Sequence, residues 1–97
     1  MKQIRLELTM SQAIEDDFLT DVDFAVPGIK YTQIADVAGR GYSVPKLGSA
    51  IWPQLNTMFI IYCTEEEAER VFSVVKGLRK RYADEGFACF KSEAEEM

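Results

Sequence analysis

The chain has 97 residues, a length that fits one domain and is short for two. Hydrophobic residues make up 47% of it and charged residues 28%, so the composition is that of a folded domain and excludes a disordered segment. The net charge of −5 argues against a binder of duplex nucleic acid, because such proteins neutralise phosphates with a basic face. The absence of histidine removes the commonest general base and the commonest metal ligand.

The N-terminal part of the chain predicts a strand, a helix and a second strand. Residues 3–10 alternate between polar and apolar side chains, which is typical of a strand with one buried face. Residues 11–22 follow as a short amphipathic helix, with Ser11 as its N-cap and apolar residues spaced by four. After a proline–glycine step, β-branched and aromatic residues predict the second strand over residues 29–37.

The longest irregular stretch lies at residues 38–56, where glycines and prolines interrupt every periodic pattern. A loop of this length is uncommon in a compact domain and is usually functional. Residues 57–63 then form an apolar run, which predicts a strand covered on both faces.

The C-terminal part predicts a helix and a last strand. A Thr-Glu-Glu-Glu capping box begins a helix over residues 64–83, and Gly86 follows as a natural stop. Residues 87–90 form a short strand, and residues 92–97 are expected to be a frayed acidic tail.

The predicted order of elements is βαββαβ, the ferredoxin-like arrangement, in which two helices cover one face of a four-stranded antiparallel sheet. It occupies residues 1–91 as a single domain. Half of the apolar side chains on the strand 57–63 must then point away from the helices. An exposed apolar face usually marks an interface, so we expect a cyclic oligomer formed through the open sheet face.

The sequence has no catalytic constellation and no spacing of metal ligands, so we expect neither enzyme activity nor a metal site. Cys63 and Cys89 lie in apolar runs, which predicts buried thiols without a disulfide and a cytoplasmic protein. The RNA-recognition motif shares this element order, but the strand 57–63 lacks the basic residue and glycine of its signature.

Three segments are candidates for binding. The glycines at 39 and 41 would let backbone N–H groups approach an anion, and Arg40 could bind phosphate, but from these residues alone a flexible turn is the favoured explanation. Trp52 could pack on a neighbouring subunit or, less favoured, stack on a ligand base. The basic cluster at residues 76–81 complements the dipole at the helix C-terminus, so a solvated face is favoured there over a ligand site.

Three local matches extend this interpretation. Residues 37–41 (Val-Ala-Gly-Arg-Gly) look like the step from the second strand into a long loop. Residues 52–66 look like the exit of that loop, the third strand and the second helix start, and residues 86–90 take the place of a later loop and fourth strand. On these matches the chain resembles the PII-like branch of the nitrogen-regulatory PII signalling superfamily, whose two loops are called the T-loop and the B-loop.

The resemblance implies a cytoplasmic homotrimer that binds a small ligand in clefts between subunits, with an adenine nucleotide as the candidate ligand. Gly39, Arg40 and Gly41 would form the T-loop side of each cleft, and Gly86 the B-loop side. Ligand binding would reshape loop 38–56, which then regulates a target such as a transporter or a metabolic enzyme. The loop residues predicted to contact that partner are Tyr42, Lys46 and Trp52.

The chain also departs from the family pattern. Where the classical B-loop wraps nucleotide phosphates with glycines and a lysine, residues 82–87 keep one glycine and carry Asp84 and Glu85, which argues against the classical mode of ATP binding. The alternative is a ferredoxin-like protein-interaction module with no small-molecule ligand. The related divalent-cation tolerance trimers are a remote option, because a metal site here would need carboxylates or backbone oxygens alone.

Overall fold

The computed structural model describes residues 1–39 and 55–97. The loop residues predicted to bind ligand or partner at positions 40, 41, 42, 46 and 52 lie outside these ranges. The elements are β1 (Lys2–Ser11), a 3-10 turn η1 (Gln12–Ile14), α1 (Glu15–Ala25), β2 (Thr32–Val37), β3 (Asn56–Cys63), α2 (Glu65–Arg81) and β4 (Phe87–Glu95).

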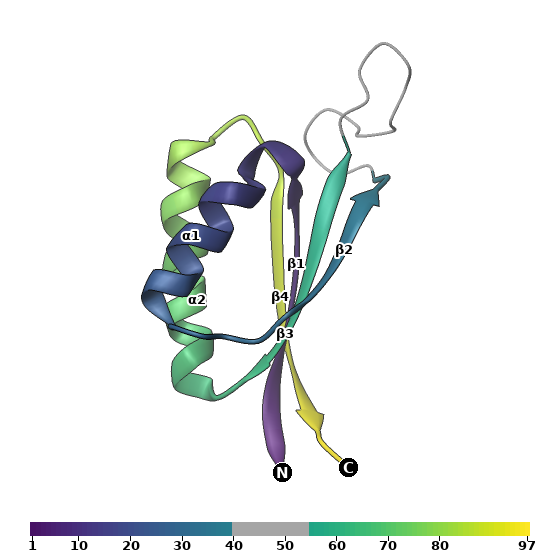
Figure 1. Ribbon diagram of the computed structural model, residues 1–97, viewed down its shortest axis with the longest axis vertical. Helices are drawn as coiled ribbons and strands as arrows, with labels where there is room; N and C mark the ends of the chain where they lie inside the picture. The colour runs from purple at the N-terminus through teal and green to yellow at the C-terminus, as the bar shows by residue number, and fades with distance from the viewer. Residues whose placement is uncertain (40–54) are drawn as a thin grey trace.

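The predicted ferredoxin-like fold is confirmed. The sheet has the strand order β2-β3-β1-β4, and every neighbouring pair is antiparallel. Figure 1 shows both helices on one face of this sheet and the opposite face uncovered. The two edge strands are β2 and β4, so the end of β2 and the turn before β4 belong to opposite edges of one sheet.

The core lies between the helices and the sheet because β1 buries every second side chain against the helical layer. The ring of Phe18 on α1 packs on that of Phe59 on β3, with 4.9 Å between their centroids. The apolar stripe of α2 covers the same layer, as its helical spacing predicts. The buried apolar side chains of the two central strands are Ile4, Leu6, Leu8, Met10, Phe59, Ile61 and Cys63.

The two helices begin differently. The capping box of α2 forms as predicted: the amide of Thr64 donates to Glu67 Oε1 at 2.9 Å, and the amide of Glu67 donates to Thr64 Oγ1 at 3.1 Å. Ser11 also caps, but it caps the 3-10 turn η1, so α1 begins only at Glu15. The chain does not enter the α-helix at Gln12, because the amide of Gln12 donates to the carbonyl of Leu55 beside β3.

The last strand is longer than predicted. It was expected to end at Phe90, but it continues to Glu95, so residues 92–95 of the expected tail belong to the sheet. They pair with the first residues of β1, where Lys2 lies opposite Glu95, a cross-strand pair of opposite charge. The amide of Glu96 donates to the carbonyl of Met1 at 3.0 Å, and both termini lie together at the end of the sheet opposite the turn that precedes β4 (Figure 1).

Both cysteines have free thiols, as predicted; Cys63 is buried and Cys89 is half-buried. Burial raises the pKa of the Cys63 thiol from about 9 to about 11, with smaller contributions from the carboxylates of Glu67 and Glu65. The unfolded chain then loses this proton at lower pH than the folded chain does. The stability that Cys63 contributes is therefore complete below about pH 8 and is lost as the pH rises through 9 to 11.

We expect this loss to appear in alkaline unfolding. Between pH 8 and pH 11 the Cys63 thiol should remove about 2 kcal/mol from the free energy of unfolding. Urea titrations at fixed protein concentration measure it as the difference between the unaltered protein and Cys63→Ala. The variant starts less stable because it leaves a cavity, but its curve should fall less steeply with pH. Parallel pH curves would contradict the prediction.

Candidate functional site

The candidate site has two parts, and both lie at the same end of the sheet. One is the root of the loop at residues 40–54, where β2 ends and β3 begins; the other is the turn at residues 82–86, which precedes β4 (Figure 1). Of the predicted ligand residues, Gly39 and Gly86 are described, and they belong to these two parts respectively. The two edge strands are three inter-strand steps apart in the four-stranded sheet. At about 4.8 Å per step, the edges lie roughly 14 Å from each other.

Gly39 is half-buried beside the first residue of β3. A Cβ atom at position 39 would lie 3.0 Å from Nδ2 of Asn56, so the glycine allows a close approach of the two strand ends. Since the contact is with the end of a side chain, a small substituent there requires only a small movement of Asn56. This makes position 39 suitable for substitution experiments.

Polar side chains from η1 and α1 hold the root of the loop. Asp36 has a φ of +57° in an irregular part of β2, and its Oδ1 accepts a hydrogen bond from Nε2 of Gln12 at 2.6 Å. Gln33 on β2 donates to Oε1 of Glu15 at 2.7 Å and to Oγ1 of the buried Thr57 at 3.1 Å. Sequence reasoning missed this group, because its partners lie up to 24 residues apart and no local pattern marks them.

Gly86 is exposed, and the turn that contains it is short. The amide of Glu85 donates to the carbonyl of Tyr82 at 3.0 Å and closes the turn. The hydroxyl of Tyr82 donates to Oδ2 of Asp17 on α1, and this bond raises the pKa of Tyr82 above its usual value, with burial as the second cause. The tyrosine therefore stays a protonated donor at neutral pH.

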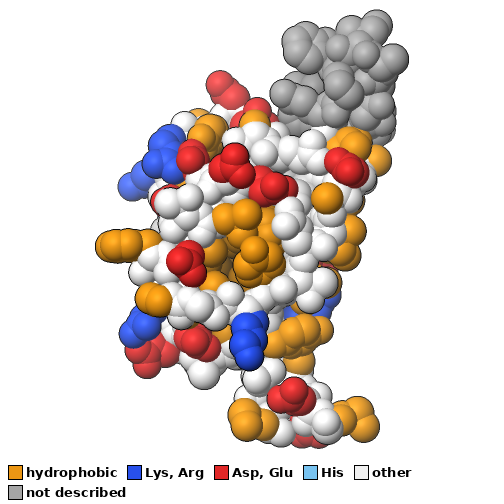
Figure 2. Space-filling view, in the orientation of Figure 1, with side chains coloured by type: hydrophobic (Ala, Val, Ile, Leu, Met, Phe, Trp, Pro, Cys, Tyr) orange, Lys and Arg blue, Asp and Glu red, His pale blue; other side chains and the backbone are white. Residues whose placement is uncertain are grey.

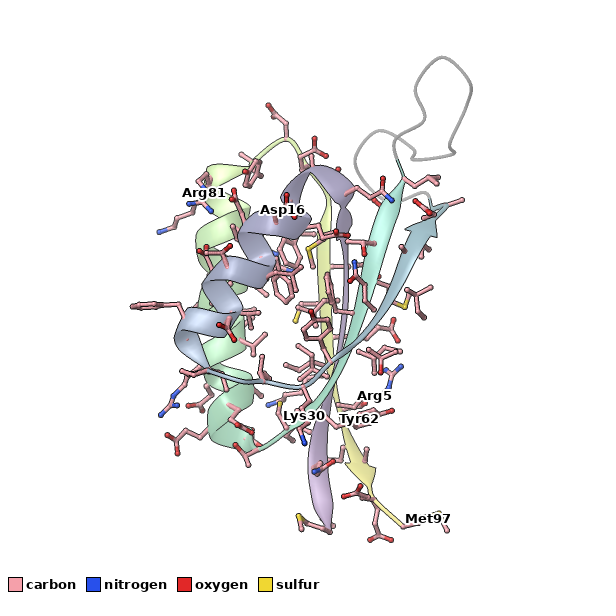
Figure 3. The ribbon with its side chains drawn as sticks, viewed as in Figure 1. Arg5, Asp16, Lys30, Tyr62, Arg81 and Met97 are labelled. Atoms are coloured by element: carbon pink, nitrogen blue, oxygen red, sulfur yellow. The ribbon has the colours of Figure 1, made fainter. Side chains whose placement is uncertain are left out.

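The basic cluster at residues 76–81 has structural partners. Arg79 is exposed, as expected of a solvated face, yet its Nε and Nη2 both donate to the carbonyl of Phe87, at 3.2 and 2.9 Å. Arg81 lies beside α1 (Figure 3), with Nη2 at 3.3 Å from Oδ2 of Asp17 and 3.4 Å from Oδ2 of Asp21. The sequence explained these cations by the helix dipole alone and missed their role in attaching the turn.

The open sheet face carries the other half of the apolar side chains on β3, as predicted. Cross-strand register places Ile60 between Thr32 and Glu7, and Met58 between Ile34 and Thr9. Three large apolar side chains on this face are strongly exposed: Ile34 at 45%, Tyr62 at 51% and Phe90 at 65%. Hydrophobic side chains line the sheet side of the molecule at the right of Figure 2.

One ion pair lies within this apolar face. Nη1 of Arg5 donates to Oε1 of Glu7 at 3.0 Å, and both side chains are only about one third exposed. Hydrogen bonds to Glu7 and then to Tyr62 raise the pKa of Arg5. Figure 3 shows Arg5 and Tyr62 together on the side of the sheet away from the helices. The charge is thus neutralised within the chain itself, which lowers the cost of covering this face.

Within residues 1–39 and 55–97, no group of three or more cysteine, aspartate or glutamate side chains is placed to hold a metal ion. Neither helix of that described part is long and apolar enough to cross a membrane.

Comparisons with known proteins give matches of structure alone. No family model and no curated protein matches the sequence. The fold matches CPII from Thiomonas intermedia K12 bound to ADP and bicarbonate, with 17% identity and a TM-score of 0.77 over 97% of this chain and 87% of that one. CPII bound to ADP, AMP and bicarbonate matches with 13% identity and a TM-score of 0.71, over 100% and 97% of the two chains.

A third match is a putative PII-like signalling protein from Thermus thermophilus, with 16% identity and a TM-score of 0.69 over 97% of this chain and 88% of that one. CPII is itself described as a nitrogen regulatory PII-like protein. The resemblance stated from the sequence is therefore confirmed at the level of the fold: this chain has the fold of PII-like proteins over nearly its whole length.

Proposed function

We propose that this chain, with its PII-like fold, is a homotrimeric signalling protein that binds an adenine nucleotide between subunits and regulates a partner through loop 38–56. The observation that carries the proposal is the position of Gly39 and Gly86. They lie at one end of the sheet but on opposite edges, so one chain does not bring them together. Two copies placed side by side would bring the Gly39 edge of one against the Gly86 edge of the next.

The open sheet face supports the proposed oligomer. It exposes large apolar side chains on three strands, β2, β3 and β4, and carries its one described ion pair already neutralised. Water contact with such a face is unfavourable, and packing three sheets together would remove it. A closed ring also limits the assembly to a definite size.

The ligand class is proposed from the fold and the loop residues. CPII has been solved with ADP and with AMP bound. In this chain Gly39, Arg40 and Gly41 would supply backbone N–H groups and a guanidinium from one subunit, and Gly86 a backbone N–H group from its neighbour. Ligand binding in the cleft would then change the conformation of loop 38–56. A cytoplasmic target such as a transporter or a metabolic enzyme would recognise that change. Tyr42, Lys46 and Trp52 are the proposed contacts with that target.

The regulatory role is supported by the description of the Thermus thermophilus match as a signalling protein. We therefore propose that the nucleotide is a signal bound and released unchanged, and that the chain is not an enzyme.

A specific observation favours the alternative of an interaction module without a small ligand. Asp84 and Glu85 put carboxylates into the turn, and the guanidinium of Arg81 beside them contacts Asp17 and Asp21. Arg79 brings a guanidinium beside Gly86, but its Nε and Nη2 already donate to the carbonyl of Phe87, so the turn offers little free positive charge to phosphate groups.

Native mass spectrometry and isothermal calorimetry test the proposal together. We expect a mass of three chains and a saturable heat with ADP at a stoichiometry of one per chain, because each chain contributes both cleft edges. A trimer that gives no heat with ADP, AMP or ATP would establish the alternative. A monomer would contradict the trimer and with it the shared cleft.

A further inference from the structure

The turn at residues 82–86 is exposed at its glycine, yet side chains fix it on both sides. In its backbone, the amide of Tyr82 ends α2 on the carbonyl of Leu78 at 2.8 Å, and the amide of Glu85 returns to the carbonyl of Tyr82 at 3.0 Å. A short exposed turn with a glycine would by itself sample many conformations. What limits this turn is its attachment to α1 and to β4.

The attachment to α1 is made by Tyr82 at the start of the turn. Its hydroxyl donates to Oδ2 of Asp17, and the guanidinium of Arg81 lies 3.3 Å from the same oxygen. Arg81 also contacts Asp21, one turn further along α1. Two side chains at the end of α2 therefore bind the same face of α1, and the beginning of the turn cannot move without breaking a charge-assisted bond.

The attachment to β4 lies at the end of the turn and is made by Arg79 on α2. Two nitrogens of its guanidinium donate to the carbonyl of Phe87, the residue after Gly86. Because the guanidinium is planar and its donors are fixed, this contact sets the orientation of the peptide between Phe87 and Ala88, one residue beyond the glycine. A lysine would keep the charge but offer a single flexible ammonium group in place of the two-donor fork.

We infer that Tyr82 and Arg79 are positioning residues that hold the turn around Gly86 in its ligand-binding conformation before the ligand arrives. The inference rests on the proposed function, in which Gly86 lines the nucleotide cleft. A turn already ordered in the free protein loses little entropy on binding, so the attachments that order it increase the affinity for the ligand. Neither side chain touches the ligand in this account; each acts through the backbone of residues 85–87.

The first test removes one hydroxyl. Tyr82→Phe keeps the ring and loses the bond to Asp17; Tyr31→Phe, which loses an exposed hydroxyl on a ring packed against Phe59, is the matched control. With ADP as the probe, we expect affinity to fall about five- to tenfold in Tyr82→Phe, the loss typical of one such hydrogen bond. Hydrogen exchange at the Glu85 amide should accelerate as well. The thermal midpoint should fall by a few degrees relative to the control, because the same bond is lost from the folded state.

The second test replaces the guanidinium of Arg79, whose two nitrogens donate to the carbonyl of Phe87. Arg79→Lys keeps the charge on α2, and Arg70→Lys is its control, since Arg70 pairs with Glu66 on the exposed side of the same helix. We expect Arg79→Lys to weaken ADP binding and to speed exchange at Glu85, and Arg70→Lys to change neither. A merely structural role would lower the thermal midpoint but leave ADP affinity as it was.

The outcomes separate this inference from the proposed function. Absence of ADP binding by the unaltered protein contradicts the function, and exchange at the Glu85 amide then decides the inference alone. Unchanged exchange in both variants overturns the inference in either case. Unchanged ADP affinity in both variants, with binding by the unaltered protein, overturns it as well.

Discussion

Replacing Ile60 by lysine is expected to convert the proposed trimer to monomers at micromolar concentration. Ile60 lies at the centre of the open sheet face, between Thr32 on β2 and Glu7 on β1. In a single subunit the lysine stem would lie along the sheet with its ammonium group near Glu7, so the fold should survive. In the trimer the same ammonium group would be buried in all three copies, and each uncompensated buried charge costs about 3 kcal/mol or more.

Analytical ultracentrifugation measures this change, and circular dichroism checks that the monomers are folded. The matched control is Phe24→Lys, which places the same charge on α1, where the side chain of Phe24 is 89% exposed on the helical side of the molecule. It should remain trimeric. If Ile60→Lys stays trimeric while Phe24→Lys dissociates, the helical layer and not the sheet face forms the interface.

Two variants that each fail to bind ADP are expected to restore binding when they share a trimer. Gly39→Asp and Gly86→Asp would each place a carboxylate against the nucleotide phosphates, on opposite sides of the cleft, and abolish measurable binding. In co-expressed, randomly mixed trimers, a cleft is intact when a Gly86→Asp chain supplies its Gly39 edge and a Gly39→Asp chain supplies its Gly86 edge. Each edge has an even chance of coming from the required variant, so about one quarter of all clefts are intact.

Calorimetry of the mixed trimers measures that fraction as the apparent stoichiometry. Gly77→Asp serves as the control, since it adds the same charge on α2, where a Cβ atom would meet no atom within 4 Å. It should bind ADP like the unaltered protein. If both edges of a cleft came from one chain, every cleft in the mixture would carry one carboxylate and no binding would return.

The sequence was sufficient for elements whose signals are local. The alternation along β1, the capping box at Thr64 and the helical spacing of α2 each depend on residues within a few positions of one another, and each is found as predicted. The end of β4 was missed because residues 91–95 are mostly charged or polar. They form a strand only because β1 is long enough to pair with them.

The candidate site could be predicted only where glycine marks it. Gly39 was proposed because it opens the Gly-Arg-Gly step after a strand, and Gly86 because it takes the place of a loop glycine in the family resemblance. The fold puts both at one end of the sheet, and their role as ligand residues stays a prediction. The side chains that hold these positions carry no such signal. In the sequence Asp17 looks like a helix-start carboxylate and Tyr82 like an apolar position of α2, and only the packing of α1 against α2 brings together residues 65 positions apart.

The neighbouring termini make the chain almost a closed ring. β1 and β4 are adjacent strands, and the backbone of Glu96 is hydrogen-bonded to that of Met1. A short linker could therefore join the two ends, and the chain could be reopened within residues 40–54. Such a circular permutant would keep all seven elements of the described residues and both proposed cleft edges, but would divide the proposed partner-binding residues between two chain ends. In the proposed function, nucleotide sensing and signalling to a target share loop 38–56, and the permutant would make the two separable by covalent topology alone.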